Sequence, residues 1–212
     1  MTVPGDIQFR RVTRLKDFDY RSSFAYFITI CVRNRECVFG TVTGDTVSLS
    51  RRGLVARDCW FDIPKHHPHV ELDSFVIMPN HTHGILLFVG DPPVVATPAS
   101  RPSLATGPTS GSLGAVIGSF KAAVTRSINK LRPGAGSALW QPNYYEHVIR
   151  NDFSRDRIRN YIESNPLRWA QDAENPAGDG TDAVDAFIRS LNDSPLRGDR
   201  DAGVATTRED RA

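Results

Sequence analysis

Apolar and β-branched residues gather in short runs along the first third of the chain. Residues 25–32 (AYFITICV) predict a buried strand, and residues 41–50 (TVTGDTVSLS) predict the loop and second strand of a hairpin. Over residues 52–63 the apolar positions recur at helical spacing, and Pro64 is expected to end that helix.

Two more strands and a long helix are predicted next. Residues 69–78 (HVELDSFVIM) and 81–89 (HTHGILLFV) predict strands on either side of a tight Pro79-Asn80 turn. Residues 112–131 place their large apolar side chains on one face and their basic side chains on others, which predicts an amphipathic helix.

The last predicted elements lie beyond residue 139. Residues 140–149 (WQPNYYEHVI) predict a strand or an extended segment, and residues 182–191 predict a short helix. Between them, Ser154 is the expected N-cap of a helix that runs to Ser164 and is closed by Pro166. Because strands outnumber the helices between them and form neighbouring hairpin-like pairs, we expect an α+β fold with an antiparallel sheet and helices packed on it.

Composition and charge divide the 212 residues into unlike parts. Residues 171–212 hold five arginines and ten acidic residues, a net charge of −5, which leaves +7 on residues 1–170 although the whole chain carries +2. A basic body suits a polyanionic partner, but this surplus also fits many cytosolic enzymes. We expect a basic arm over residues 1–24, one domain over residues 25–172 with a flexible Pro-rich connector over residues 91–111, and an acidic, largely disordered tail over residues 173–212.

Several classes of protein are disfavoured. Three cysteines cannot form a paired disulfide framework, the first dozen residues lack the apolar core of a signal peptide, and the longest apolar run is far too short to cross a bilayer. No Walker or dinucleotide-binding glycine motif occurs, so no nucleotide cofactor is expected. We expect a cytoplasmic protein without a membrane partner.

The pair His81 and His83 is the most informative local feature. Alternate residues of a strand point to the same face, so both imidazoles should project together while Thr82 faces the other side. Two adjacent imidazoles suit a divalent metal, and a pair of surface histidines on an exposed sheet face is the competing interpretation. A second histidine group consists of His66, His67 and His69. Because His66 and His67 stand directly before Pro68, we expect a polar loop here rather than a metal site.

Tyr161 and Asn165 form a second candidate pair. If their segment is helical, they lie one turn apart on the same face, so a phenol and a carboxamide can address one centre. Asn165 also precedes Pro166, where a helix loosens. The alternative is a tyrosine packed at the helix end with an asparagine as its cap.

Four motifs in matching order add a family resemblance. They are FVIMPNHTHGI (75–85), WQPNYYEHVIR (140–150) with YIESNP (161–166), DYRSSFAYFITICVRNRECVFG (19–40) and SLGAVIGSFKAAVTRSIN (112–129). Together they resemble the single-tyrosine HUH transposases of the IS200-like superfamily, and in particular the REP-associated tyrosine transposase branch, from about residue 10 to residue 172. The chain departs from the family at Thr82, where a bulky hydrophobe is usual; since this side chain should face away from the histidines, the change should weaken packing more than chemistry.

The resemblance implies a ferredoxin-like or RRM-like HUH domain and a set of functional residues. His81, His83 and Asn165 would hold a divalent ion, Mg²⁺ or Mn²⁺, and Tyr161 would be the nucleophile. The implied activity is a transposase that cleaves and rejoins single-stranded DNA at hairpin or REP-like palindromic elements through a 5′-phosphotyrosine intermediate. A tyrosine hydroxyl, with a pKa near 10, is a poor nucleophile at pH 7, which agrees with a need for metal assistance.

The family resemblance also implies a binding partner. The implied partner is single-stranded DNA carrying a hairpin, and we expect a nucleoid-associated cytoplasmic protein that acts as a monomer or a homodimer. Two other functions remain as alternatives to a transposase. One is a catalytically silent nucleic-acid-binding module of the same fold, and the other is a nuclease that activates water and leaves Tyr161 unmodified. Candidate DNA contacts are the basic residues of the arm and the long helix: Arg10, Arg11, Arg14, Lys16, Lys121, Arg126 and Lys130.

Overall fold

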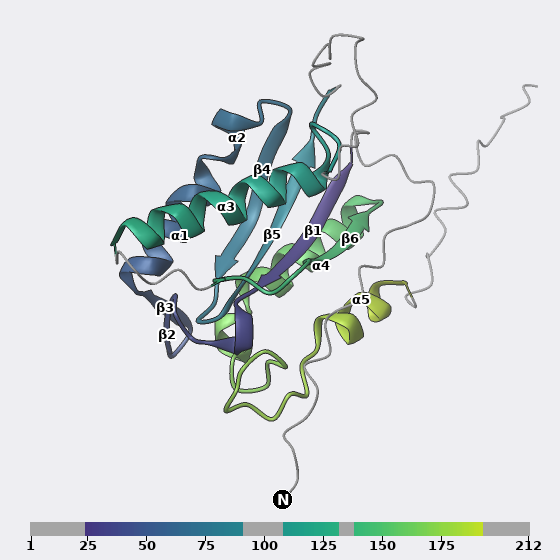
Figure 1. The fold of residues 1–212 in the computed structure, drawn as a ribbon. Coiled ribbons are helices and arrows are strands. Elements are labelled where there is room, and N and C mark those ends of the chain that lie inside the picture. The colour runs from purple at the N-terminus through teal and green to yellow at the C-terminus, as the bar shows by residue number, and fades with distance from the viewer. Residues whose placement is uncertain (1–23, 91–107, 132–137, 193–212) are drawn as a thin grey trace, which may run out of the picture.

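A computed structural model describes residues 24–90, 108–131 and 138–192 (Figure 1). Its elements are β1 (Ala25–Cys31), η1 (Arg33–Arg35), β2 (Gly40–Thr43), β3 (Thr46–Leu49), α1 (Arg51–Phe61), α2 (Ile63–His66), β4 (Val70–Ile77), β5 (His81–Phe88), α3 (Leu113–Leu131), β6 (Tyr145–Ile149), α4 (Asp152–Glu163), η2 (Pro166–Arg168) and α5 (Val184–Asn192). The predicted basic arm, most of the predicted connector and the end of the predicted tail lie outside the described residues.

Four strands form one antiparallel sheet in the order β4-β5-β1-β6. Helix α1 follows β1 and precedes β4, and helix α3 connects β5 to β6, so these elements alternate along the chain as βαββαβ. That connectivity with β1 and β5 at the centre is the ferredoxin-like arrangement, and the predicted α+β class with an antiparallel sheet is confirmed.

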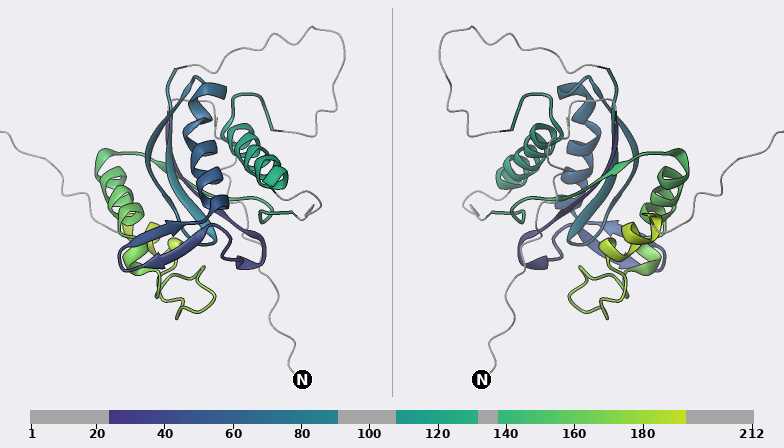
Figure 2. Two further views of the ribbon diagram at one scale, coloured as in Figure 1. Left: turned by 90° about the vertical axis from the view of Figure 1, so that its left-hand side faces the viewer. Right: turned by 90° about the vertical axis from the view of Figure 1, so that its right-hand side faces the viewer.

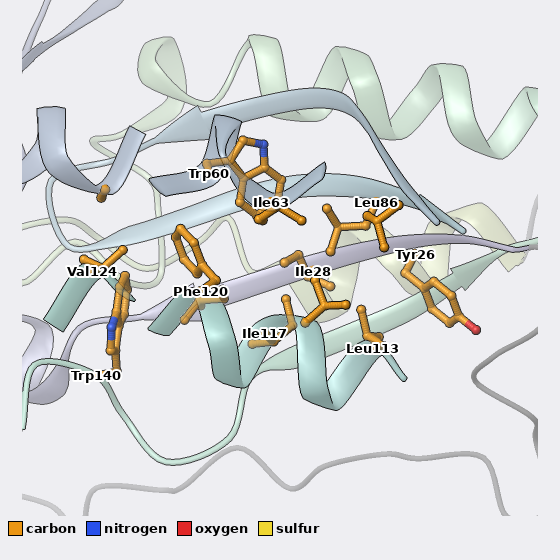
Figure 3. Packing of buried hydrophobic residues seen from close by; sticks show 14 of the residues in the cluster. Tyr26, Ile28, Trp60, Ile63, Leu86, Leu113, Ile117, Phe120, Val124 and Trp140 are labelled. Atoms are coloured by element: carbon orange, nitrogen blue, oxygen red, sulfur yellow. The ribbon is translucent and has the colours of Figure 1, made fainter. Parts of the chain in front are cut away.

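Helices cover both faces of this sheet (Figure 2). Helices α1 and α3 pack on one face over a core that includes Ile28, Trp60, Leu86 and Phe120 (Figure 3). Helices α4 and α5 pack on the other face over a second core. Since successive residues of a strand point to opposite faces, the central strands supply side chains to both cores and are buried almost throughout.

Gly84 makes room for the largest side chain of the first core. A Cβ atom at this position would collide with the indole ring of Trp60, which is fully buried and stacks on Phe75 with ring centroids 4.5 Å apart. A glycine is therefore needed here so that α1 can approach the strand that carries His81 and His83.

The helix after the hairpin differs from the prediction. Helix α1 ends at Phe61, and Pro64 does not end it but lies in the first turn of a second short helix, α2. The first turn of a helix tolerates proline because its N–H groups have no partner within the helix.

Two further local predictions are corrected. Strands β2 and β3 pair with each other in a separate two-stranded sheet, with Gly44 at positive φ in their turn, so the hairpin does not include β1. The N-cap of α4 is Asn151, three residues before the predicted cap Ser154. The Asn151 side-chain oxygen accepts a hydrogen bond from the Ser154 backbone N–H at 2.8 Å.

The remaining described elements agree with the predictions. Strands β4 and β5, helix α3 and the short helix α5 lie where the hydrophobic pattern placed them, and residues 140–149 contribute the five-residue strand β6. Helix α5 belongs to the predicted tail, yet it buries Val184, Ile188 and Leu191 in the second core, so this part of the tail packs on the sheet. Among the described residues, no helix is long and apolar enough to cross a membrane.

Candidate metal and nucleophile site

Two imidazoles meet on the sheet face that α4 covers. His81 and His83 are 0% and 2% exposed, and their Nε2 atoms lie 3.1 Å apart. Their shared face is the one that strand geometry predicts, and their burial excludes the alternative of an exposed surface pair. A separation of 3.1 Å is close to the roughly 3.0 Å expected for two nitrogen ligands each about 2.1 Å from one cation at a right angle.

The opposite ring nitrogens are each held by a buried side chain. His81 Nδ1 lies 3.0 Å from Asn80 Oδ1, and His83 Nδ1 lies 2.9 Å from Thr29 Oγ1. Metal-binding histidines commonly use the second ring nitrogen in this way, because the hydrogen bond fixes the ring and directs the other nitrogen to the ion. The arrangement therefore fits two Nε2 ligands.

A buried carboxylate that the sequence did not nominate completes the group. Asp172 is 4% exposed, and its Oδ2 lies 3.6 Å from His81 Nε2, while its Oδ1 accepts from the Glu174 backbone N–H at 2.6 Å. Within the part of the chain that the structure describes, His81, His83 and Asp172 form the one group of three or more side chains that could hold a metal. No sequence signal distinguished Asp172 from its acidic neighbours.

Tyr161 and Asn165 lie on the same side of the sheet as the histidines. The Tyr161 ring centroid is 5.5 Å from that of His83, and Asn165 follows one turn later in right-handed helical conformation between α4 and η2. Asn165 is fully buried, and neither its Oδ1 nor its Nδ2 has a hydrogen-bond partner among the described residues. A buried carboxamide with neither atom satisfied is costly, which makes a ligand for it reasonable.

Helix α5 covers the tyrosine. Phe187 stacks on the Tyr161 ring with centroids 4.2 Å apart, and the Arg168 guanidinium lies 5.1 Å from its centroid. Tyr161 is 3% exposed as a result. An ion pair fixes α4 to the edge strand: Arg159 donates to both carboxylate oxygens of Asp73 at 2.7 to 3.1 Å.

Among the described residues, His66, His67 and His69 do not form a group that could hold a metal. His69 Nε2 lies 2.9 Å from the Gly111 carbonyl oxygen, and its ring packs edge-on against Phe88. Burial, with the neighbouring histidines, lowers the pKa of His67. His66 ends helix α2 and His69 is buried beside β4, so the predicted polar loop describes only His67 of the three.

The candidate DNA contacts fall in different settings. The four arm residues lie outside the described residues. Lys121 donates to the backbone carbonyls of Gln141 and Asn143 at 2.7 and 2.9 Å, and burial lowers the pKa of its ammonium. Arg126 and Lys130 are exposed on α3, on the face of the sheet opposite the histidines.

The sheet order and the buried ligand group define an α+β protein of the ferredoxin-like arrangement with a candidate metal centre beside a tyrosine. No protein-family model matches the chain. An uncharacterised protein from Haemophilus influenzae is 40% identical over 172 residues, which cover 78% of this chain and 93% of the relative. At this identity and coverage, the chain belongs to the same family as the Haemophilus protein.

Two solved structures are similar at lower identity. One, a REP-associated tyrosine transposase bound to a REP hairpin, is 19% identical with a TM-score of 0.49 and covers 73% of each chain. The other, a candidate transposase from Deinococcus radiodurans R1, is 20% identical with a TM-score of 0.40 over 71% of this chain and 96% of its own.

Proposed function

We propose that this protein is a metal-dependent, single-stranded DNA transesterase of the HUH transposase type, with Tyr161 as its nucleophile. The observation that supports this best is the convergence of His81 and His83, with Nε2 atoms 3.1 Å apart, beside a tyrosine whose ring lies 5.5 Å from His83. The sequence resemblance assigns the same residues to the same roles, independently of their positions in space.

The residues present fit a divalent cation. Two imidazole nitrogens and one carboxylate, from His81, His83 and Asp172, have donor atoms within 4.8 Å of one another. Nitrogen with carboxylate oxygen suits Mn²⁺, and Mg²⁺ also accepts such oxygen ligands. The carboxamide of Asn165 is buried, has no hydrogen-bond partner among the residues that the structure describes, and is the further ligand that the resemblance implies.

The reaction would exchange one phosphoester for another. The bound ion supplies charge that makes the scissile phosphate more electrophilic. Tyr161 Oη forms a bond to phosphorus as its proton leaves, the bond from phosphorus to the 3′ oxygen breaks, and the released 3′ oxygen takes up a proton. The 5′ end stays on the tyrosine, and a 3′-hydroxyl can reverse the step without ATP.

Access to Tyr161 imposes a condition on this function. Tyr161 is 3% exposed and Phe187 stacks on its ring, so little of the side chain is open to a phosphate while α5 lies as it does in this structure. We expect α5 to move when DNA binds.

A denaturing-gel assay tests the proposal. Full-length protein is incubated with end-labelled single-stranded hairpin DNA and Mn²⁺ or Mg²⁺, and a covalent protein–DNA adduct is expected. Tyr161→Phe should abolish the adduct without changing metal binding, whereas Tyr145→Phe, at a partly buried tyrosine of β6 that packs against the same core, should retain it.

Other results favour the alternatives. Cleavage that survives Tyr161→Phe would identify a nuclease that activates water. Binding of the hairpin without cleavage in any divalent metal, even after α5 is loosened, would identify a silent binding module of the same fold.

A further inference from the structure

Asn80 joins the histidine pair to two other parts of the chain. It is 1% exposed and lies in the turn before β5. Its Nδ2 donates to the backbone carbonyls of Arg35 at 3.0 Å and Glu174 at 2.7 Å, and its Oδ1 lies 3.0 Å from His81 Nδ1. The side chain thus contacts η1, the segment that carries Asp172, and a candidate ligand.

The two carbonyls determine which way the Asn80 amide faces. A carbonyl oxygen only accepts hydrogen bonds, so the side-chain atom between Arg35 O and Glu174 O has to be the amide nitrogen. The amide oxygen therefore faces His81, and His81 Nδ1 has to donate to it. In the neutral ring, the proton then sits on Nδ1 and the lone pair on Nε2, which points at His83.

His83 is held by a partner of a different kind. A threonine hydroxyl donates or accepts equally well, so Thr29 Oγ1 can serve either tautomer of His83. Lone pairs on both Nε2 atoms, 3.1 Å apart, would repel each other. Without a cation, His83 should therefore carry its proton on Nε2 and donate a hydrogen bond to His81 Nε2. With a cation bound, the His83 proton would lie on Nδ1, which would donate a hydrogen bond to the Thr29 hydroxyl oxygen.

We infer that Asn80 is a positioning residue that keeps His81 in the ligand tautomer at all times, while Thr29 lets His83 change tautomer when the ion binds. This inference depends on the proposed metal site. Through Glu174, the same amide also anchors the segment that brings Asp172 to within 3.6 Å of His81 Nε2. One side chain therefore orients one ligand and holds the chain that supplies another.

Two substitutions of Asn80 separate orientation from stability. Asn80→Leu removes both the acceptor for His81 and the donors to the carbonyls, and we expect about 10- to 100-fold weaker Mn²⁺ binding by calorimetry on the full-length protein. Asn80→Asp keeps an acceptor for His81 but loses the donors, so it should lower the melting temperature yet bind Mn²⁺ at least about tenfold more tightly than Asn80→Leu. The matched control is Asn175→Leu, which removes a tail amide bonded to Trp169 O and Ala177 N and should leave Mn²⁺ affinity unchanged.

If Mn²⁺ affinity falls in proportion to melting temperature across these variants, Asn80 has only a structural role and the inference is overturned. A second measurement needs no variant: long-range ¹H–¹⁵N spectra of the metal-free protein should show the Nδ1–H tautomer for His81 and the Nε2–H tautomer for His83. An Nε2–H tautomer at His81 would also overturn the inference. If the wild-type protein binds no Mn²⁺, the proposed function fails instead, and the His81 tautomer still tests the role of Asn80.

Discussion

The ring of Tyr161 lies flat against the ring of Phe187, with centroids 4.2 Å apart and planes 13° from parallel. Phe187 belongs to α5, so a helix of the acidic C-terminal part covers the residue that we propose as nucleophile. The same contact leaves Tyr161 only 3% exposed, so under the proposed function α5 would have to move before DNA reached the tyrosine.

Phe187→Ala should therefore raise the rate of adduct formation. An aromatic pair contributes about 0.5 to 1.5 kcal/mol beyond the area it buries, so the population with α5 displaced should grow by about 2- to 10-fold. The rate of Tyr161–DNA adduct formation is measured under single-turnover conditions at saturating DNA.

Phe153→Ala is the matched control for this change, because Phe153 is an aromatic residue of α4 that is 61% exposed and outside the second core. It should leave the rate unchanged. A folded Phe187→Ala protein whose rate equals or falls below that of wild type would show that α5 does not limit access.

The ion pair between Arg159 and Asp73 predicts a pH-dependent stability. Burial alone would raise the pKa of the Asp73 carboxyl, but hydrogen bonds from Arg159 and Ser74, with nearby positive charge, hold it below its ordinary value. Because the folded-state pKa lies below the unfolded value of about 3.9, the contribution is complete above about pH 4 and is lost as the pH falls through the folded-state pKa. Asp73→Asn should lose about 1 kcal/mol at pH 7, or about 2 to 4 °C in melting temperature.

The difference in melting temperature between wild type and Asp73→Asn should shrink when the pH is lowered below 4, since the wild-type carboxyl is then neutral as well. Asp156→Asn is the control, because Asp156 bonds the same arginine at 2.9 Å but is 66% exposed. It should change the free energy of unfolding by less than about 0.5 kcal/mol. A pH-independent difference for Asp73→Asn would refute the electrostatic origin.

The sequence predicted most of the fold because the sheet strands carry strong local signals. Strands β1, β4 and β5 are short runs rich in apolar and β-branched residues, the apolar residues of α3 recur at helical spacing, and the order of these elements restricts the topology. The misplaced features depend on contacts that no local pattern contains: β2 pairs with β3 because of a glycine turn, and Pro64 is compatible with either end of a helix.

The candidate site was predictable only where its residues are close in sequence. His81 and His83 are two positions apart on a strand, and Tyr161 and Asn165 one helical turn apart, so periodicity alone places each pair on one face. Asp172 reaches His81 through the fold of residues 164–174, and nothing in its local sequence indicates this.

Asp172→Asn should lower Mn²⁺ affinity because it removes the one negative charge of the candidate ligand group. We expect a loss of at least about tenfold by calorimetry, with the fold retained, since ligand charge sets much of the affinity for a hard cation. Asp185→Asn, on the exposed side of α5, is the control and should bind Mn²⁺ like wild type. Equal affinity for Asp172→Asn and wild type would restrict the ligands to the two histidines and Asn165.

Thr82 lies between the two histidines and provides a test of packing alone. It is fully buried on the face opposite the imidazoles, and its hydroxyl has no hydrogen-bond partner among the described residues. A buried hydroxyl without a partner costs about 1 to 3 kcal/mol, and valine has nearly the same shape, so Thr82→Val should raise the free energy of unfolding by about 1 kcal/mol in urea titrations. Thr41→Val, at an exposed position of β2, should change it by less than about 0.5 kcal/mol. Because Thr82 faces away from the ligands, the substitution should leave Mn²⁺ affinity and adduct formation as in wild type; a loss of either would mean that this side of the strand also shapes the metal site.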